Sequence, residues 1–110
     1  MTAGRARLGP KPLTSGQRSR LRSLAHSLEP AVLVGRAGVT DAVVREVDDA
    51  LEARELIKVR LAGDREQRAL AAGAIAERTS SELAGQIGRV AILYRPSLDP
   101  ARRKVDLSSD

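Results

Sequence analysis

The chain has 110 residues, the length of one domain, and contains no cysteine and one histidine. This excludes disulfides, thiolate metal sites and a multi-histidine metal site, and we expect no cofactor, no metal and a reducing, cytoplasmic location. No run approaches the ~18 apolar residues of a membrane helix, and no apolar stretch follows the N-terminal arginines as in a secretory signal.

The charges are unevenly distributed along the chain. Residues 1–40 hold seven Arg or Lys and one Glu, a charge of +6, whereas residues 41–66 hold five basic and eight acidic side chains, a charge of −3. Residues 67–110 hold seven basic and five acidic side chains, so the total is +5. The positive N-terminal third indicates a polyanion partner. A solvated surface without a partner is the alternative that charge alone leaves open.

The first 40 residues predict an arm, a helix and a strand. Residues 1–13 combine Gly, Pro and basic side chains without periodicity, which is typical of a flexible basic arm. Thr14 and Gln17 have the spacing of a capping box and predict a helix start. The apolar stripe of that helix comprises Leu21, Leu24, Ala25 and Leu28. Pro30 ends the segment, and residues 31–34 form a short buried strand.

A Gly-x-x-Gly turn follows this strand and organises the site that we predict. Gly35 and Gly38 both permit positive φ and a close approach of the backbone to a ligand. Thr40 is expected to cap the next helix, so that the turn amides and the helix N-terminus together suit a phosphate. Arg36 adds charge inside the turn. The alternative is a tight strand-to-helix connection without a ligand, because short glycine motifs often match by chance.

Alternation and turn residues predict the remaining elements. The helix from Thr40 to about residue 54 is acidic, and its core side chains are expected to be Val43, Val47, Ala50 and Leu51. In the strand 56–61, the apolar Ile57, Val59 and Leu61 alternate with Lys58 and Arg60, which gives one apolar and one basic face.

A third helix and two further strands complete the predicted domain. The helix 65–78 is expected to direct Leu70, Ala71, Ala74 and Ile75 inward. Gly73 inside it costs on the order of 1 kcal/mol relative to alanine, which close packing would explain. Strands 82–87 and 90–95 are expected to form a hairpin around a two-residue turn. The second of them is apolar on both faces and is therefore expected to be central, and residues 97–110 indicate a flexible polar tail.

The element order α-β-α-β-α-β-β predicts an α/β (α+β) domain over residues 14–96. We expect a monomer with two layers and a four-stranded mixed sheet, backed by at least the second and third helices. Strands that a helix joins are expected to pair in parallel. The first helix is expected to cover part of the opposite face, because the last strand is apolar on both sides.

Four segments, in this order and spacing, resemble the CRM domain (chloroplast RNA splicing and ribosome maturation). They are LRSLAHSLEP (21–30), VLVGRAGVT (32–40), ELIKVR (55–60) and IGRVAILYRP (87–96). The resemblance spans residues 14–96, and the stand-alone bacterial YhbY-like proteins are nearest in size. Two positions depart from the family pattern: Ala37 replaces a frequent Asn, and Gly85 replaces a frequent Gln in the third strand.

The resemblance implies an RNA-binding domain with a fold like the C-terminal domain of translation initiation factor three. It also implies association with precursor large-subunit ribosomal RNA, and hence a ribosome assembly factor. We expect RNA contacts from Gly35, Arg36, Ala37, Gly38, Thr40, Arg18, Arg22, Lys58, Arg60 and Arg95. Tyr94 is the only aromatic residue, so a stacking platform for bases is excluded. The favoured mode is therefore recognition of backbone and shape in structured RNA.

Other function classes find less support in the sequence. His26 has no nucleophile motif or metal-ligand spacing beside it, so we expect no enzyme, and the glycine turn lacks the Gly-Lys-Ser/Thr of a nucleotide-binding loop. No helix-turn-helix or basic zipper indicates duplex DNA. The alternative that we retain is a protein-interaction module, whose acidic second helix docks a basic ribosomal protein.

Overall fold

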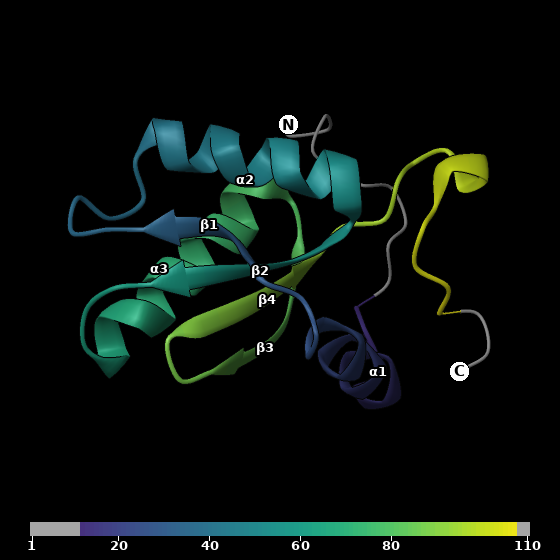
Figure 1. Ribbon diagram of the computed structural model, residues 1–110, viewed down its shortest axis with the longest axis horizontal. Coiled ribbons are helices and arrows are strands. Elements are labelled where there is room, and N and C mark those ends of the chain that lie inside the picture. The colour runs from purple at the N-terminus through teal and green to yellow at the C-terminus, as the bar shows by residue number, and fades with distance from the viewer. Residues whose placement is uncertain (1–11, 108–110) are drawn as a thin grey trace.

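The computed structural model describes residues 12–107 (Figure 1). Residues 1–11 of the predicted arm lie outside the described residues. The elements in chain order are α1 (Ser15–Ala25), β1 (Pro30–Val34), α2 (Asp41–Arg54), β2 (Leu56–Leu61), α3 (Arg65–Thr79), β3 (Glu82–Ile87), β4 (Val90–Tyr94) and the 3₁₀ helix η2 (Pro100–Arg102). The order from α1 to β4 is the predicted one, the bounds of β2 and β3 are those expected, and η2 was not predicted.

The helix starts follow from local side-chain hydrogen bonds. At α1, the Thr14 hydroxyl accepts from the Gln17 amide at 3.0 Å, and the Gln17 side chain accepts from the Thr14 amide at 3.0 Å. Asp64 and Gln67 form the same reciprocal pair at α3, with both distances 2.8 Å. Each pair satisfies two amides that otherwise lack a partner at a helix start.

The four strands form one mixed sheet in the order β1-β2-β4-β3. β1 and β2 pair in parallel, and β4 pairs antiparallel with both β2 and β3. The expectation that β2 and β3 pair in parallel is wrong, because β4 lies between them. β4 is buried at four of its five positions and takes the central place, which leaves the more polar β3 at the edge.

The larger core lies between the sheet and the helices α2 and α3, which cover the same face (Figure 1). Its buried side chains are Val32, Val34, Val47, Leu51, Ile57, Val59, Leu61, Ala72, Ile75, Ala91 and Leu93. Two expectations for α3 are wrong. Leu70 is 69% exposed, and Gly73 is exposed with no atom within 4 Å of the place that a Cβ would occupy, so close packing does not explain that glycine.

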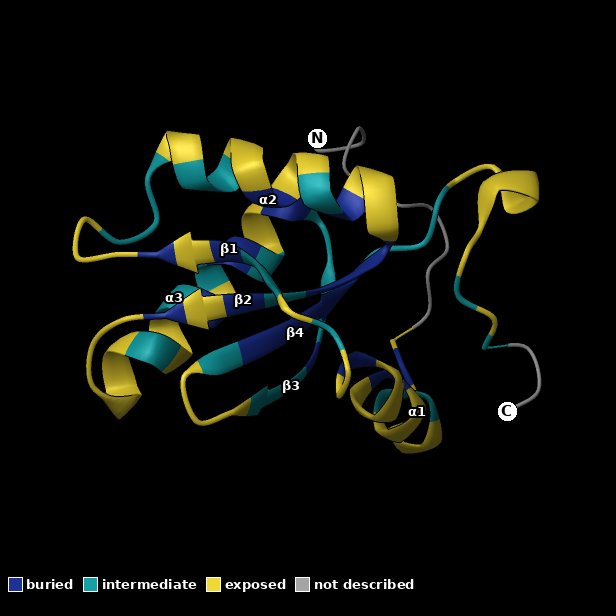
Figure 2. Cartoon of the chain, in the orientation of Figure 1, coloured by how far each residue is buried: buried dark blue, intermediate teal, exposed yellow. Residues whose placement is uncertain are grey.

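The second core lies under α1, on part of the opposite face. Its buried side chains are Leu13, Leu21, Ala25, Leu56, Ala84, Ile92 and Tyr94. The expectation that Leu13 belongs to a flexible arm is wrong, because it is buried here. Leu24, expected in the apolar stripe of the first helix, is instead 40% exposed. Because α1 covers only one end of this face, the rest of the sheet remains open (Figure 2).

Residues 97–107, expected as part of a flexible tail, make contacts with the domain through Glu55. This residue caps α2 at φ 68° and is 2% exposed. Its carboxylate accepts the amides of Ser97, Lys104 and Val105 at 2.8, 2.7 and 3.0 Å. Val105 and Leu107 also pack against the second core. We call residues 97–107 the C-terminal strap.

Candidate nucleic-acid interface

The Gly-x-x-Gly turn projects from the end of β1. The Gly38 amide donates to the Gly35 carbonyl at 3.0 Å, and the Thr40 amide donates to the Gly38 carbonyl at 3.0 Å. Gly38 has φ +78°, whereas Gly35 does not have a positive φ. Gly35, Arg36 and Ala37 are exposed, and nothing lies within 4 Å of a Cβ added at either glycine. The turn is therefore open to a ligand on its outer side.

The start of α2 already has anionic and hydroxyl groups of its own. The Thr40 hydroxyl accepts from the Val43 amide at 3.1 Å. The Asp41 carboxylate lies in the first turn and pairs with Arg78 at 2.7 Å. The hydrogen bond from Arg78 lowers the pKa of Asp41, so this carboxylate is charged at neutral pH.

The turn amides, rather than the helix N-terminus, are the donors left for a phosphate. Within residues 12–107, the amides of Arg36, Ala37 and Val39 make no hydrogen bond, and neither does the Arg36 guanidinium.

A mixed apolar and basic row crosses the open sheet face beside this turn. Leu33 pairs with Arg60, Arg60 with Val90, and Val90 with Ile87. Leu33 and Ile87 are 65% and 62% exposed, which is unusual for large apolar side chains in a sheet. Arg60 is exposed between them, and its guanidinium has no hydrogen bond or ion pair with any described residue. The row contains no carboxylate.

Two further cations lie between this row and α1. Arg22 reaches from α1 onto β3, where its Nη1 donates to the Ala84 carbonyl at 3.1 Å. A Cβ at Gly85 would lie 2.6 Å from the Arg22 Cδ, so the departure from the family pattern at Gly85 makes room for this side chain. Lys58 Nζ donates to the His26 carbonyl at 3.2 Å. These bonds to carbonyls hold both cations on the open face without neutralising them.

Arginines that we did not predict connect the loops at the turn end of the sheet. Arg68 donates to the carbonyls of Gly88 and Gly63 at 3.2 and 2.7 Å. Arg89 is exposed in the β3–β4 turn, and its carbonyl accepts from the Leu61 amide at 2.7 Å. The predicted two-residue hairpin turn places Arg89 at the tip of the β3–β4 hairpin, but its position beside the end of β2 follows from the pairing of β2 with β4.

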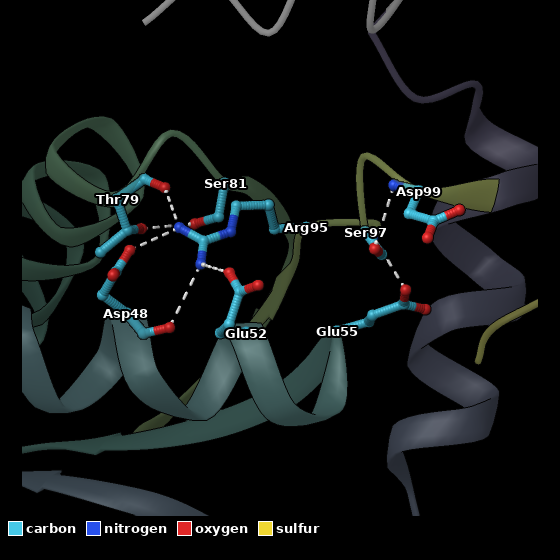
Figure 3. A network of polar contacts seen from close by, with 8 residues as sticks. All are labelled: Asp48, Glu52, Glu55, Thr79, Ser81, Arg95, Ser97 and Asp99. Atoms are coloured by element: carbon cyan, nitrogen blue, oxygen red, sulfur yellow. Dashed lines mark hydrogen bonds and ion pairs between the residues drawn. The ribbon is translucent and has the colours of Figure 1, made fainter. Parts of the chain in front are cut away.

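Two of the predicted contact residues lie elsewhere. Arg95 is committed to a network that Figure 3 shows: its guanidinium contacts the Asp48 and Glu52 carboxylates at 2.6 and 3.4 Å and the Thr79 carbonyl at 2.7 Å. Its side chain is only 10% exposed. Arg18 is half-buried and donates to the Leu13 carbonyl at 2.9 Å. The structure thus places seven of the predicted residues in the turn or on the open face, puts Thr40 at the start of α2 beside the turn, and separates Arg95 and Arg18 from them.

The only aromatic side chain, that of Tyr94, lies in the second core. Tyr94 is 6% exposed beneath α1, and burial raises its pKa, with the Glu55 charge adding to the effect. His26 caps the end of α1 and is exposed.

None of the helices that the structure describes is long and apolar enough to cross a membrane. Residues 12–107 also bring no three His, Asp or Glu side chains together as a metal site would require.

We call the surface formed by residues 33–39, Arg22, Lys58, Arg60 and residues 87–90 the basic face. It offers exposed amides and cations for phosphates beside apolar side chains for ribose or bases. Phosphate contacts of this kind set position and affinity, and they carry little sequence information by themselves.

Comparison with known proteins finds relatives and a solved structure that are named as RNA-binding or putative RNA-binding proteins. An "RNA-binding protein" of Haemophilus influenzae is 43% identical over 86 residues, covering 77% of this chain and 87% of that protein. "Probable RNA-binding protein YqeI" of Bacillus subtilis is 42% identical over 86 residues, covering 77% and 90%. The solution structure of SAV1595 from Staphylococcus aureus superposes with a TM-score of 0.74 at 35% identity, covering 86% of this chain and 99% of that one.

The match to a family model decides the classification. The model of the CRS1/YhbY (CRM) domain matches residues 13–95, which include the α-helices α1, α2 and α3 and the four strands β1 to β4. The expected family is therefore confirmed, and so is the α+β fold with its mixed four-stranded sheet. The chain belongs to the CRS1/YhbY (CRM) domain family.

Proposed function

We propose that this protein binds structured RNA through the basic face and acts as a ribosome assembly factor on precursor large-subunit ribosomal RNA. The observation that carries the RNA-binding proposal is the convergence of the Gly35–Gly38 turn with Arg22, Lys58 and Arg60 on one open surface. Relatives named as RNA-binding proteins support it. The ribosomal target rests on the family resemblance.

The proposed contact is made mainly to the RNA backbone. A phosphate lies against the amides of Arg36 and Ala37, with the Arg36 guanidinium beside it. Arg60, Lys58 and Arg22 then follow the backbone across the sheet, and Leu33, Val90 and Ile87 contact ribose or base surfaces. A chain with one tyrosine, buried beneath α1, offers no ring for stacking, so this mode gives affinity with modest sequence selectivity.

Docking of a basic ribosomal protein on α2 takes second place, because that helix uses part of its charge within the domain. Asp41 pairs with Arg78, and Asp48 and Glu52 pair with Arg95. Each of these carboxylates would have to exchange an internal partner for an external one. We likewise propose a binding role rather than catalysis, since the relatives are named as RNA-binding proteins.

Replacing Arg36 with Glu tests the proposal. The side chain is exposed and makes no hydrogen bond within residues 12–107, so the melting temperature should stay nearly constant. The affinity for ribosomal RNA should fall, because a carboxylate would face phosphate where amides are arranged for an anion. The slope of log K against log salt should decrease by roughly 0.7 to 0.9 for each lost phosphate contact.

Arg45→Glu is the matched control. Arg45 is exposed on α2, outside the basic face, and the substitution changes the net charge equally. A filter-binding titration at two salt concentrations should separate the two variants. An equal loss of RNA affinity in both variants would show that net charge alone attracts RNA. An Arg36→Glu variant that binds RNA as tightly as the parent would show that the turn only connects β1 to α2.

A further inference from the structure

A cavity of 430 Å³ lies at the other end of β1 from the glycine turn. Its apolar floor is formed by Leu24, Leu28, Ala31, Leu56 and Val105. Leu24 is 40% exposed at its mouth. The volume falls in the range of cavities that hold small ligands, and a mostly apolar lining with a few polar groups is typical of such sites.

Three cations from three separate elements border this cavity: Arg20 of α1, Arg54 of α2 and Lys104 of the C-terminal strap. The Arg20 Nε donates to the Asp106 carbonyl at 3.2 Å, which holds α1 against the strap. Arg54 is exposed, and its guanidinium has no hydrogen bond or ion pair with any described residue.

Two carboxylates, Glu29 and Asp106, also border the cavity, so the formal charge around it is +1. A net charge of +1 beside an apolar lining suits a ligand with an apolar part and a single anionic group.

The strap forms one wall of the cavity because Glu55 holds it there. The amides of Lys104 and Val105 donate to the buried Glu55 carboxylate, and this places the Val105 side chain in the floor and Lys104 at the border. The strap lies beyond residues 13–95, the part of the chain that the family model matches. The cavity therefore combines the family domain with a segment outside that match.

We propose that this cavity receives one unstacked nucleotide of the RNA bound on the basic face, with its base on the apolar floor and its phosphate among Arg20, Arg54 and Lys104. This inference rests on the proposed function and adds a second contact to it. Ala31 lines the cavity and Gly35 begins the turn, and the four residue steps of extended chain from one to the other span about 13 Å. A few nucleotides of one strand can span that distance.

Two RNA hairpins of identical stem test the proposal, one fully paired and the other with a single bulged adenosine. The parent protein should bind the bulged hairpin about tenfold more tightly, since only an extruded base can bury apolar surface in the cavity. Arg54→Gln and Leu24→Gln should each bring the two affinities close together. Arg36→Glu should weaken the binding of both hairpins alike and leave their ratio unchanged.

Matched controls keep the test specific to the cavity. Arg45→Gln changes an exposed arginine of the same helix, and Leu70→Gln changes a leucine that is 69% exposed on α3. Both should retain the preference for the bulge, and thermal melting should confirm that all variants fold. Equal binding of the two hairpins by the parent, or a preference that survives both cavity variants, overturns this inference alone and leaves the cavity to an occupant other than RNA. Failure of the parent to bind either hairpin overturns the proposed function and this inference together.

Discussion

Gly35 and Gly38 are the two glycines of the Gly-x-x-Gly motif, but their backbone conformations differ. Only Gly38 has a positive φ, at +78°, so a side chain there strains the backbone. Gly35 lies at an ordinary φ with open space around its Cα. The expectation that both glycines use positive φ is therefore wrong for Gly35, and this difference separates a folding effect from a binding effect.

Alanine at each glycine should give different results. Gly38→Ala should lower the free energy of unfolding by about 1–2 kcal/mol, the cost of a left-handed conformation for a residue with a Cβ. Gly35→Ala should leave stability unchanged but weaken RNA binding, since a methyl group would then stand where the RNA backbone approaches. Urea unfolding and RNA titration on both variants provide the measurement. Unchanged RNA affinity of Gly35→Ala would show that no ligand comes close to the turn backbone.

Tyr94 offers a probe of the core under α1, because the chain has one tyrosine and no tryptophan. Burial raises the pKa of its phenol above the ordinary value of about 10. In the folded protein, the phenolate absorbance should therefore appear at a higher pH than in urea-unfolded protein. The linked change in stability is absent below pH ~10, and the fold loses stability as the pH rises from there toward the folded pKa, because the unfolded chain releases its proton first. Coincident titration curves for folded and unfolded protein would contradict the burial of this side chain.

At the scale of elements, the sequence predicts the strands and helices better than their pairing. Alternation in residues 56–61 and the Gly88-Arg89 turn determine the bounds of β2 and of the hairpin, and both are local features. The position of β4 between β2 and β3 depends on which strand buries most on both faces. The apolar residues on both faces of strand 90–95 correctly predicted an inner place for it, but they do not say which strands flank it, so its pairing with β2 had to come from the structure.

The C-terminal strap could not be predicted for a related reason. Glu55 at a helix end indicates a solvated charge, and residues 97–107 are mostly polar. In the structure, the Glu55 carboxylate is buried and accepts three amides that lie about 40 to 50 residues further along the chain. Such contacts leave no periodic signal. Arg95 is a similar case. Its positive charge led us to predict an RNA contact, whereas in the structure its guanidinium pairs with Asp48 and Glu52.

Gly73 lowers the helix propensity of α3 without a packing reason. It is exposed in the helix interior, and a Cβ would meet no atom within 4 Å. Gly73→Ala should therefore raise the free energy of unfolding by about 1 kcal/mol, which corresponds to roughly 4–8 °C in melting temperature for a domain of this size. RNA affinity should not change. A lower melting temperature would mean that this position needs glycine for a contact that the structure does not show.

At the scale of the whole molecule, the two faces of the sheet have separate tasks. α2 and α3 cover one face and bury the larger core, whereas α1 covers only one end of the other. The open remainder carries Arg60 near the glycine turn and Lys58 and Arg22 closer to α1, and the acidic α2 lies on the opposite side of the sheet (Figure 1). The uneven charge along the sequence thus corresponds to a basic and an acidic side of the molecule, and we expect the basic side to face a bound polyanion.

Chemical-shift mapping during a titration with ribosomal RNA tests the location of the interface most directly. We expect the largest backbone amide shifts in residues 33–39, 58–60 and 87–90, with Arg36 and Ala37 among them. Amides on the outer surfaces of α2 and α3 should shift little. Shifts concentrated on α2, or an absence of shifts in the Gly35–Gly38 turn when RNA is bound, would contradict the central claim that the basic face binds RNA.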